Sequence, residues 1–358
     1  MMPDNYSDMS ERSNLSAGDG VADSEVVQVG LNGFGRIGRN LFRAVLDDPR
    51  IELVGINDVM NFEDVAYLAK HDTVMGRLDE VTRVDDTLVV GDTSVPLYNV
   101  QNPTELPWDA LDVDVALECT GIFRTKEDAS AHLTAGAEKV VISAPPKGEE
   151  YVRQIVYGVN HDEYEGEAVV SNASCTTNSV SPVAMVLDDE YGIEHGMLTT
   201  VHAYTGSQSL IDSPMAKTRR GRAAAENIVP TSTGAAAATT TILPQLNGKL
   251  DGMAIRVPVP NGSITELVVS LSTSPSVEEL NDAFRDAADS GPLAGVLGYT
   301  DEEVVSSDIL GLPFSSTVDL ESTNQVGDGG LYKILTWYDN EFGFANRMLD
   351  VAAYITAE

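Results

Sequence analysis

The chain has 358 residues and a formal net charge of −34 at pH 7, from 56 acidic and 22 basic side chains. This length is more than one hydrophobic core usually organises, so we expect two domains. A strong negative charge repels phosphate groups, which argues against nucleic acid or an anionic membrane as the main partner.

The acidic residues are spread along the whole chain rather than gathered in one tail. In dilute buffer such an excess destabilises a compact fold by self-repulsion. In molar salt the Debye length falls to about 3 Å, and most of that repulsion is screened. The composition therefore favours a halophilic protein adapted to a salt-rich cytoplasm over an ordinary acidic protein.

Two cysteines, Cys119 and Cys175, do not make a disulfide framework. The N-terminus has no cationic start followed by an apolar stretch, and no apolar segment is long enough to span a bilayer. We expect a cytoplasmic protein with no bound metal. Residues 1–24 are rich in Ser, Asp, Asn and Gly, which predicts a disordered acidic extension or an addition foreign to the natural chain.

The first folded segment contains a dinucleotide fingerprint. A strand pattern over residues 25–31 leads into the motif Gly33-Phe34-Gly35-Arg36-Ile37-Gly38, and a helical pattern follows at once. A second strand over residues 51–57 ends in Asp58, twenty residues after Gly38. In this setting the glycines permit a tight turn, close approach of a pyrophosphate and close helix–strand packing. Asp58 accepts hydrogen bonds from ribose hydroxyls and repels a 2′-phosphate, so NAD is favoured over NADP.

Strand and helix patterns alternate as far as Ser171, with a strand over residues 113–117, a helix over 127–134 and a strand over 140–143. This alternation predicts a Rossmann-type, doubly wound parallel sheet. Later strand patterns come with few helices, which predicts an α+β catalytic domain with a mostly antiparallel sheet. Its clearest helix begins with a capping box at Ser276 and Glu279. We place the domains at residues 25–171 and 172–339, followed by a final helix over 340–358.

Cys175 directly precedes an apolar stretch with helical spacing. A cysteine at a helix N-terminus lies beside unpaired N–H groups and the positive end of the dipole, which favours its thiolate as a nucleophile. The alternative is a buried structural cysteine. His202 ends a strand pattern, and if it faces Cys175 it can hold the thiolate as an ion pair and then act as base and acid, although a lone histidine is more often structural. We assign His71, His132, His161 and His195 to structure or surface.

Six ordered segments resemble phosphorylating glyceraldehyde-3-phosphate dehydrogenases over residues 26–358. They are residues 29–39, 171–178, 200–205, 232–236, 256–258 and 337–341. The resemblance implies that Cys175 attacks glyceraldehyde 3-phosphate while His202 takes the hydroxyl proton. Hydride transfer to NAD and attack by inorganic phosphate on the thioester then give an acyl phosphate. It also implies a homotetramer, in which residues 207–230 border the cofactor of a neighbouring subunit.

The resemblance assigns roles to further residues. The cofactor-binding set is Asn32, Gly33, Phe34, Gly35, Arg36, Ile37, Gly38, Asp58, Thr120, Phe123, Ser143 and Asn340. The substrate- and phosphate-binding set is Ser174, Thr176, Thr205, Arg220, Thr233, Gly234 and Arg256. For each serine or threonine alone, turn or cap chemistry is the usual role.

The sequence leaves three questions open. Ser213 replaces a frequent leucine before Pro214, and a small polar residue there leaves room for NADP as a secondary cofactor. The erythrose-4-phosphate dehydrogenase branch shares the cysteine, the histidine and the fold but hydrolyses the thioester; the intact phosphate segment favours the phosphorylating branch. A non-catalytic scaffold or nucleic-acid-binding protein is opposed by the combination of Cys175, His202 and Arg256 and by the negative charge.

Overall fold

The computed structural model describes residues 26–357. The extension predicted over residues 1–24 lies outside the described residues. By its internal contacts the chain divides into two compact units. The N-terminal unit consists of Glu25–Ser174 with Phe344–Glu358, and the central unit is Cys175–Gly343. Each unit is described by itself.

The N-terminal unit is built on a nine-stranded sheet within the described residues, in the order β10-β11-β9-β8-β1-β2-β7-β6-β5. Its strands are β1 (Val27–Asn32), β2 (Ile51–Asn57), β5 (Val81–Val84), β6 (Thr87–Val90), β7 (Thr93–Tyr98), β8 (Val115–Glu118), β9 (Lys139–Ile142), β10 (Arg153–Gln154) and β11 (Val169–Ser171). Pairing is parallel from β10 to β7 and antiparallel from β7 to β5. The predicted doubly wound parallel sheet is confirmed, with an antiparallel edge that the sequence analysis did not predict.

The helices of this unit are α2 (Arg36–Val45), α3 (Phe62–Lys70), α4 (Lys126–Ala129), α5 (Ala131–Thr134) and α9 (Phe342–Ala357), of which the last begins in the central unit. A separate hairpin pairs β3 (His71–Asp72) with β4 (Gly76–Arg77). The single helix predicted over residues 127–134 is wrong, because two short helices meet at Ser130. The Ser130 hydroxyl donates to the Lys126 carbonyl at 2.7 Å, a local bond that competes with helix continuation.

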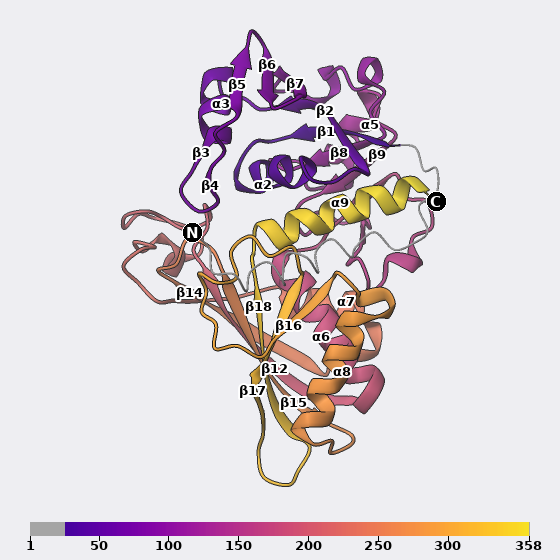
Figure 1. The fold of residues 1–358 in the computed structure, drawn as a ribbon, viewed down its shortest axis with the longest axis vertical. Coiled ribbons are helices and arrows are strands. Elements are labelled where there is room, and N and C mark those ends of the chain that lie inside the picture. The colour runs from indigo at the N-terminus through magenta and orange to yellow at the C-terminus, as the bar shows by residue number, and fades with distance from the viewer. Residues whose placement is uncertain (1–25, 358) are drawn as a thin grey trace. The chain divides into compact units, whose positions relative to one another are not determined.

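The core of the N-terminal unit lies around Trp108, which is completely buried. Gly30 in β1 and Gly55 in β2 face its ring, and a β-carbon at either glycine would lie within 3.2 Å of it. β8 is buried at every position, as expected for a central parallel strand. α9 (yellow in Figure 1) is tied to this unit by Asp350, whose carboxylate accepts from Arg50 at 2.7 Å.

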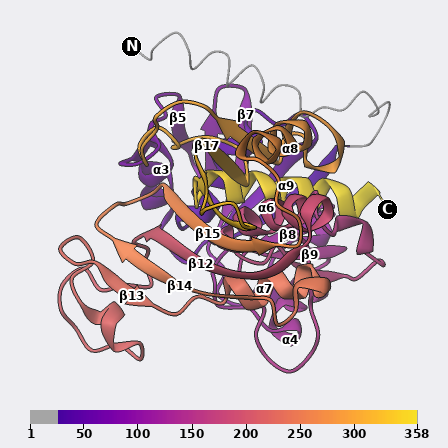
Figure 2. The same ribbon diagram turned by 90° about the horizontal axis from the view of Figure 1, so that it is seen from below.

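The central unit contains a seven-stranded sheet within the described residues, in the order β13-β14-β12-β15-β18-β17-β16. Its strands are β12 (Ile193–Ala203), β13 (Val229–Thr231), β14 (Leu250–Val257), β15 (Ser263–Leu271), β16 (Leu297–Thr300), β17 (Ser316–Gln325) and β18 (Leu331–Tyr338). Figure 2 shows β14, β12 and β15 side by side. Pairing is antiparallel except between β12 and β14 and between β16 and β17, which confirms the predicted mostly antiparallel sheet.

The helices of the central unit are α6 (Cys175–Tyr191), α7 (Ala235–Ile242) and α8 (Val277–Asp289). α6 packs on β15 and β17 and on both other helices. The predicted capping box is confirmed, since Ser276 accepts from the Glu279 backbone and the Glu279 carboxylate accepts from Ser276. This cap fixes the start of α8 and turns Leu280 and Phe284 into the core.

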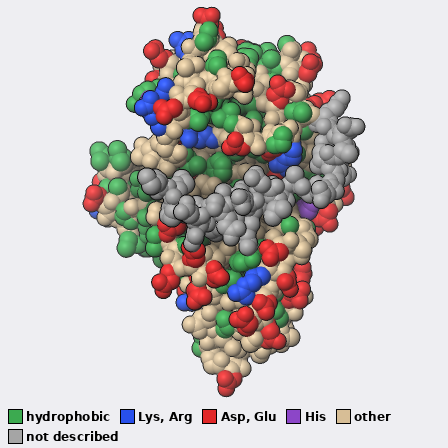
Figure 3. Space-filling model, in the orientation of Figure 1, with side chains coloured by type: hydrophobic (Ala, Val, Ile, Leu, Met, Phe, Trp, Pro, Cys, Tyr) green, Lys and Arg blue, Asp and Glu red, His purple; other side chains and the backbone are tan. Residues whose placement is uncertain are grey.

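Acidic side chains are scattered across the visible surface in Figure 3 and do not form a single patch. This distribution agrees with the even spread of Asp and Glu along the sequence. Among the helices of residues 26–357, none is both long and apolar enough to cross a membrane.

Candidate functional site

The glycines of the fingerprint have three different environments. Gly33 has φ +99°, and a β-carbon there would lie 2.6 Å from the Thr120 nitrogen. A β-carbon on Gly38 would lie 2.0 Å from the Gly33 oxygen. Gly35, at the N-cap of α2, faces open space with no atom within 4 Å of that position. Two of the glycines therefore permit close packing, while the third leaves the helix N-terminus accessible to an anion.

Asp58 is connected directly to this loop. Its carboxylate accepts from the Phe34 N–H at 2.6 Å and from the Met60 N–H at 2.9 Å. A carboxylate has further lone pairs, so it retains capacity for ribose hydroxyls. Asn32 and Phe34 are both buried.

Arg36 and Ile37 begin α2, and both are half-buried. The Arg36 guanidinium forms an ion pair with Asp72 of β3. Burial on its own would raise the pKa of Asp72, but the Met75 and Val74 N–H groups and Arg36 together lower it. The Arg36 guanidinium is thus already paired with the Asp72 carboxylate. To bind a cofactor it must either contact both groups at once or leave Asp72.

Three predicted cofactor residues follow the ends of β8 and β9. Thr120 lies against Gly33, and its hydroxyl donates to Glu118. Ser143 bonds to the thiol of Cys119 and donates its N–H to the Glu118 carbonyl at 3.0 Å. Phe123 is half-buried and makes no ring contact with another described aromatic residue. The structure therefore brings Thr120 to the glycine loop and Ser143 to the same strand ends.

Cys175 is the first residue of α6, as the sequence predicts. The turn before it is held by Ser171, whose hydroxyl accepts from the Ala173 N–H at 3.0 Å and donates to the Ala144 carbonyl at 2.8 Å. Ala173 is fully buried with φ +54°, a left-handed conformation that costs an alanine about 1 kcal/mol or more. Backbone strain of this kind is typical of functional sites, where the surrounding structure fixes one geometry.

His202 faces the thiol, with its Nε2 3.5 Å from the Cys175 Sγ. Its Nδ1 lies 2.7 Å from the Ala203 carbonyl oxygen and 3.0 Å from the Arg256 Nη1. The Ala203 carbonyl can only accept, and it is the nearer partner of Nδ1; the Arg256 Nη1, which can only donate, lies 2.8 Å from the same oxygen and can donate to it instead. We therefore assign the proton to Nδ1, so that Nε2 presents a lone pair to the thiol.

The site disfavours charge on both of these groups. Burial, followed by the positive charge of Arg256, lowers the pKa of His202 to about 3, so its imidazole is neutral at neutral pH. Burial raises the pKa of Cys175, while Arg256 and the N–H groups of Thr176 and Cys175 act in the opposite direction. The expectations that the helix N-terminus favours the thiolate and that His202 holds it as an ion pair are therefore wrong for the free site, where burial disfavours charge on both groups.

Arg256 begins a polar path that leads away from Cys175. It approaches the Thr205 hydroxyl at 3.4 Å, and Thr205 bonds to Ser207 at 2.9 Å. Ser207 accepts from the Arg220 Nη1 at 3.3 Å. The Arg256 Nε is buried and has no hydrogen-bond partner among the described residues. Two guanidinium groups and two hydroxyls thus form a polar, positively charged cluster near the thiol, a chemistry that suits an anion.

The other phosphate candidates are less tightly connected. Thr176 is buried, and its hydroxyl bonds to the Tyr338 hydroxyl at 3.0 Å. Thr233 accepts from the Ala235 N–H at 3.1 Å in the turn before α7, and Gly234 is the exposed N-cap of that helix. Ser174 is half-buried, directly before Cys175. Thr233 and Thr176 therefore have the turn and packing roles that such residues usually have.

Two residues without a role in the sequence analysis support the site. Tyr338 is buried, bonds to Thr200 of β12 at 2.8 Å and lies edge-on to the His202 ring. Ser263 accepts from the Ala203 N–H at 3.1 Å and donates to the Asn340 Oδ1 at 2.7 Å. Tyr338 lies within a segment that carries the family resemblance, but only contacts distant in sequence reveal its role.

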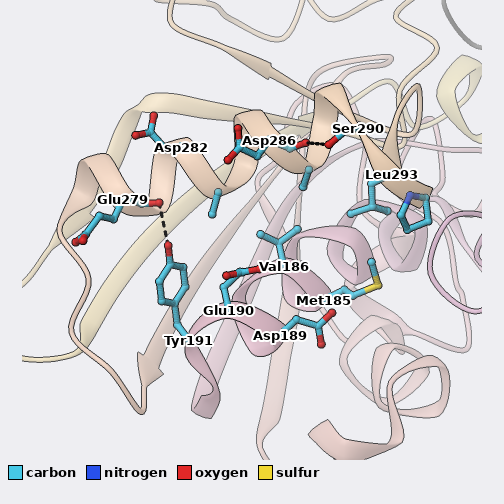
Figure 4. A pocket seen from close by; sticks show the side chains of 13 residues that line it. Met185, Val186, Asp189, Glu190, Tyr191, Glu279, Asp282, Asp286, Ser290 and Leu293 are labelled. Carbon is cyan, nitrogen blue, oxygen red and sulfur yellow. Dashed lines mark hydrogen bonds between the residues drawn. The ribbon is translucent and has the colours of Figure 1, made fainter.

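A pocket of about 480 Å³ lies between the end of α6 and α8, outside this cluster (Figure 4). It is lined by five acidic residues and several apolar ones, and Tyr191 donates to the Glu279 carbonyl at 2.9 Å along one side. None of the predicted site residues lines this pocket. Its size alone does not make it the reactive site.

A dinucleotide-type sheet and a Cys–His–Arg centre define a dehydrogenase that uses a cysteine nucleophile. The family model for "Glyceraldehyde 3-phosphate dehydrogenase, NAD binding domain" matches residues 27–126, and the model for the "C-terminal domain" of the same enzyme matches residues 174–340. The chain belongs to the glyceraldehyde-3-phosphate dehydrogenase family.

Curated relatives named glyceraldehyde-3-phosphate dehydrogenase cover nearly the whole chain. A protein of Haloarcula vallismortis is 66% identical over 93% of this chain and 99% of its own length. Relatives from Streptomyces coelicolor and Geobacillus stearothermophilus are 51% and 50% identical, over 92% and 93% of this chain and 98% and 99% of their own lengths. The match to the NAD-binding domain agrees with the cofactor predicted from the glycine motif.

Proposed function

We propose that the chain oxidises glyceraldehyde 3-phosphate with NAD and inorganic phosphate, and that Cys175 carries the acyl group as a thioester. The supporting observation is the Cys175 thiol facing the His202 lone pair at 3.5 Å, beside Arg256 with its unpartnered buried Nε. A phosphorylated aldehyde needs both a nucleophile and a fixed anion site, and this cluster contains both.

In the first step the Cys175 Sγ bonds to the aldehyde carbon, and the thiol proton passes to the His202 Nε2. The carbonyl oxygen takes up that proton and becomes a hydroxyl. His202 then removes the hydroxyl proton as the carbon loses a hydride, which leaves a thioester. A neutral imidazole with its lone pair on Nε2 is the form that this step requires. The N–H of Cys175 at the N-terminus of α6 would stabilise the developing oxyanion.

The NAD-binding residues fit their group, because Gly35 leaves the N-terminus of α2 open and Asp58 offers acceptors to a ribose. NAD supplies the hydride acceptor. We assign its binding to Gly33–Gly38, Asp58, Thr120, Phe123 and Ser143. Asn340 would hold the carboxamide through its amide nitrogen, since its oxygen accepts from Ser263.

We assign the substrate's own phosphate to Arg256, Thr205 and Arg220. The attacking phosphate would be held by Ser174, Thr176, Thr233 and Gly234. It bonds to the thioester carbon through one oxygen, and the Cys175 thiolate leaves. This assignment requires the Thr176 hydroxyl to be shared between the phosphate and Tyr338.

Initial rates of NAD reduction by glyceraldehyde 3-phosphate, measured in molar KCl with and without phosphate, test this function. We expect a fast rate that depends on phosphate. A rate indifferent to phosphate would favour the hydrolytic erythrose-4-phosphate branch, and no rate in folded protein would contradict an enzymatic function.

We further propose a homotetramer in the cytoplasm, with functional domains at residues 25–171 and 172–339 and a C-terminal helix over 340–358. The division into two compact units supports these boundaries. NADP is proposed as a secondary cofactor because Ser213 is a small residue. Its hydroxyl bonds to Ser209 at 2.6 Å, which leaves that position polar.

Adaptation to high salt is supported by the charge of −34 and by the similarity to a Haloarcula protein. We expect the melting temperature to rise steeply with KCl between about 0.1 M and about 3 M, because screening removes self-repulsion. Differential scanning fluorimetry checks this, with NaCl as a matched salt. A melting temperature independent of salt would contradict the proposal.

A further inference from the structure

Glu118 is the last residue of β8 and is 1% exposed. Its two carboxylate oxygens accept four hydrogen bonds from within the N-terminal unit. The Oε1 accepts from the Thr120 N–H at 2.8 Å and from the Thr120 hydroxyl. The Oε2 accepts from the side chains of Asn32 and His132, both of which are buried. Such convergence accounts for a buried carboxylate that has no Arg or Lys partner within residues 26–357.

The indole of Trp108 determines which ring nitrogen of His132 carries the proton. The Trp108 Nε1–H can only donate, and it lies 3.0 Å from the His132 Nδ1. Nδ1 must therefore accept, so the ring proton is on Nε2. That nitrogen lies 3.0 Å from the Glu118 Oε2 and donates to it. His132 and Trp108 are both 0% exposed, so water does not compete for these bonds.

The donor from Asn32 is fixed in the same way by a backbone amide. The Val100 N–H donates to the Asn57 Oδ1 at 2.8 Å, which identifies the Asn57 nitrogen as a donor. That nitrogen donates to the Asn32 Oδ1 at 2.7 Å. The remaining Asn32 Nδ2 then donates to the Glu118 Oε2 at 2.6 Å. Two chains of hydrogen bonds, each starting from a group that can only donate, thus end at one carboxylate.

The network holds the two loops that meet at Gly33. Asn32 directly precedes Gly33, and the Thr120 backbone lies where a β-carbon of Gly33 would be. Glu118 bonds to the residue on each side of this contact. A displacement of its carboxylate would therefore move both walls of the glycine turn together.

We propose that Glu118 is a positioning residue for the cofactor, and that His132 and Trp108 hold it in its single productive arrangement. This inference rests on NAD binding by the glycine loop in the proposed function. It gives His132 a specific role in place of the general structural one expected from the sequence. Glu118, His132 and Trp108 do not touch the cofactor in this proposal, since they act on it through Asn32 and Thr120.

The first test is Glu118→Gln, assayed by calorimetric titration with NAD and with ADP-ribose. In either amide orientation the new NH₂ group faces two donors, so one side of the network must open. We expect both ligands to bind about tenfold more weakly or worse. The loss should be equal for the two, because ADP-ribose lacks only the nicotinamide.

A matched pair at His132 gives a sharper test. His132→Gln places an NH₂ group near the original Nε2 and keeps a donor for Glu118. His132→Asn places its polar atoms near the original Nδ1, so it keeps a partner for Trp108 but loses the donor. We expect the Asn variant to bind NAD several-fold more weakly than the Gln variant, although both lose stability. A merely structural role would not separate the two affinities.

Asn160→Ala is the control for general damage. Asn160 is also buried and bonds to the Gln154 carbonyl and the Val156 N–H near β10, four strands from β1 in the sheet order. Alkylation of Cys175 in cofactor-free protein reports whether the central unit stays folded. Equal affinity losses in the Asn160 and Glu118 variants, a loss for NAD alone, or equal affinities of the His132 pair would each overturn the proposal.

If Glu118→Gln does not fold, the His132 pair decides the question. Failure of the proposed function would look different, because wild-type protein would then bind NAD without phosphate-dependent oxidation of glyceraldehyde 3-phosphate.

Discussion

His132 in the N-terminal unit and His202 in the central unit are both buried and both accept or donate at each ring nitrogen. They differ in the partners of their ring nitrogens. His132 lies between an indole N–H and a carboxylate, so the position of its proton is fixed. His202 directs its Nε2 to a thiol, a group that can give up its proton.

The difference teaches that burial and hydrogen bonding do not make a histidine catalytic. Reactivity requires a neighbour that can exchange a proton, together with a charge that keeps the imidazole neutral. Arg256 supplies that charge beside His202, whereas Glu118 of opposite sign lies beside His132. Similar burial thus accompanies a proposed proton-transfer role in one unit and a proposed alignment role in the other.

Replacing each histidine by glutamine should produce the widest separation. We expect His202→Gln to lower the turnover rate by about 10²–10⁴-fold, because the base for the thiol and the hydroxyl is lost. His132→Gln keeps a donor for Glu118, so it should leave turnover nearly unchanged and weaken NAD binding less than His132→Asn does. Initial rates over a matrix of NAD and aldehyde concentrations separate the two effects, and a comparable loss of turnover in both variants would contradict the comparison.

Removing the charge beside His202 should have the next largest effect. Arg256 lowers the pKa values of both Cys175 and His202, so Arg256→Gln should raise both. Alkylation of Cys175 by iodoacetamide should then require a higher pH, and kcat/KM should fall roughly 10–100-fold through lost phosphate binding. Alkylation rates across a pH series check the sign of the shift; a profile moved to lower pH would be the opposite result.

A smaller effect concerns stability. The pKa of His202 is about 3 in the folded chain, against its ordinary value of 6.5 in the unfolded chain. Between these values the unfolded chain holds a proton that the folded chain lacks, so the unfolding free energy falls as the pH falls through this window. His202→Gln should flatten that slope in urea titrations from about pH 7 to about pH 4.5 in high KCl. The exposed His71→Gln is the control, and an unchanged slope would argue against a buried neutral imidazole.

The smallest expected effect is that of Ala173→Gly. Glycine adopts φ +54° without strain, but it loses more entropy on folding than alanine. The two terms nearly offset, so we expect a change in unfolding free energy within about 1 kcal/mol. Alkylation of Cys175 should become slower if the strained turn fixes the thiol. A large loss of stability would show that the Ala173 methyl group, rather than its backbone, matters.

Local patterns predicted much of this molecule. The strand over residues 51–57, the glycine loop and the capping box at Ser276 each depend on residues close together in the chain. Their physics is that of turns and caps, which short motifs encode. The position of Cys175 at a helix N-terminus followed from the same kind of local pattern.

The rest depends on contacts between distant residues. The bonds that join Glu118 to Asn32 span 86 residues, and those from Thr176 to Tyr338 span 162. No periodicity encodes such pairs. The raised pKa of Cys175 also escaped prediction, because it results from burial by several elements rather than from the helix alone. The break at Ser130 depends on one hydroxyl that the apolar pattern ignores.

The two thiols of the chain lie beside side chains of opposite charge, so a single one of them can be labelled selectively. Burial and the Glu118 charge raise the pKa of Cys119 far above its ordinary value. Cys175 has Arg256 and backbone N–H groups beside it, which offset part of its burial. A limiting amount of electrophile or peroxide should therefore modify one sulfur per chain and leave the other as an internal standard. A fluorophore or spin label can thus be attached at the reactive position of the natural sequence, without removing any cysteine.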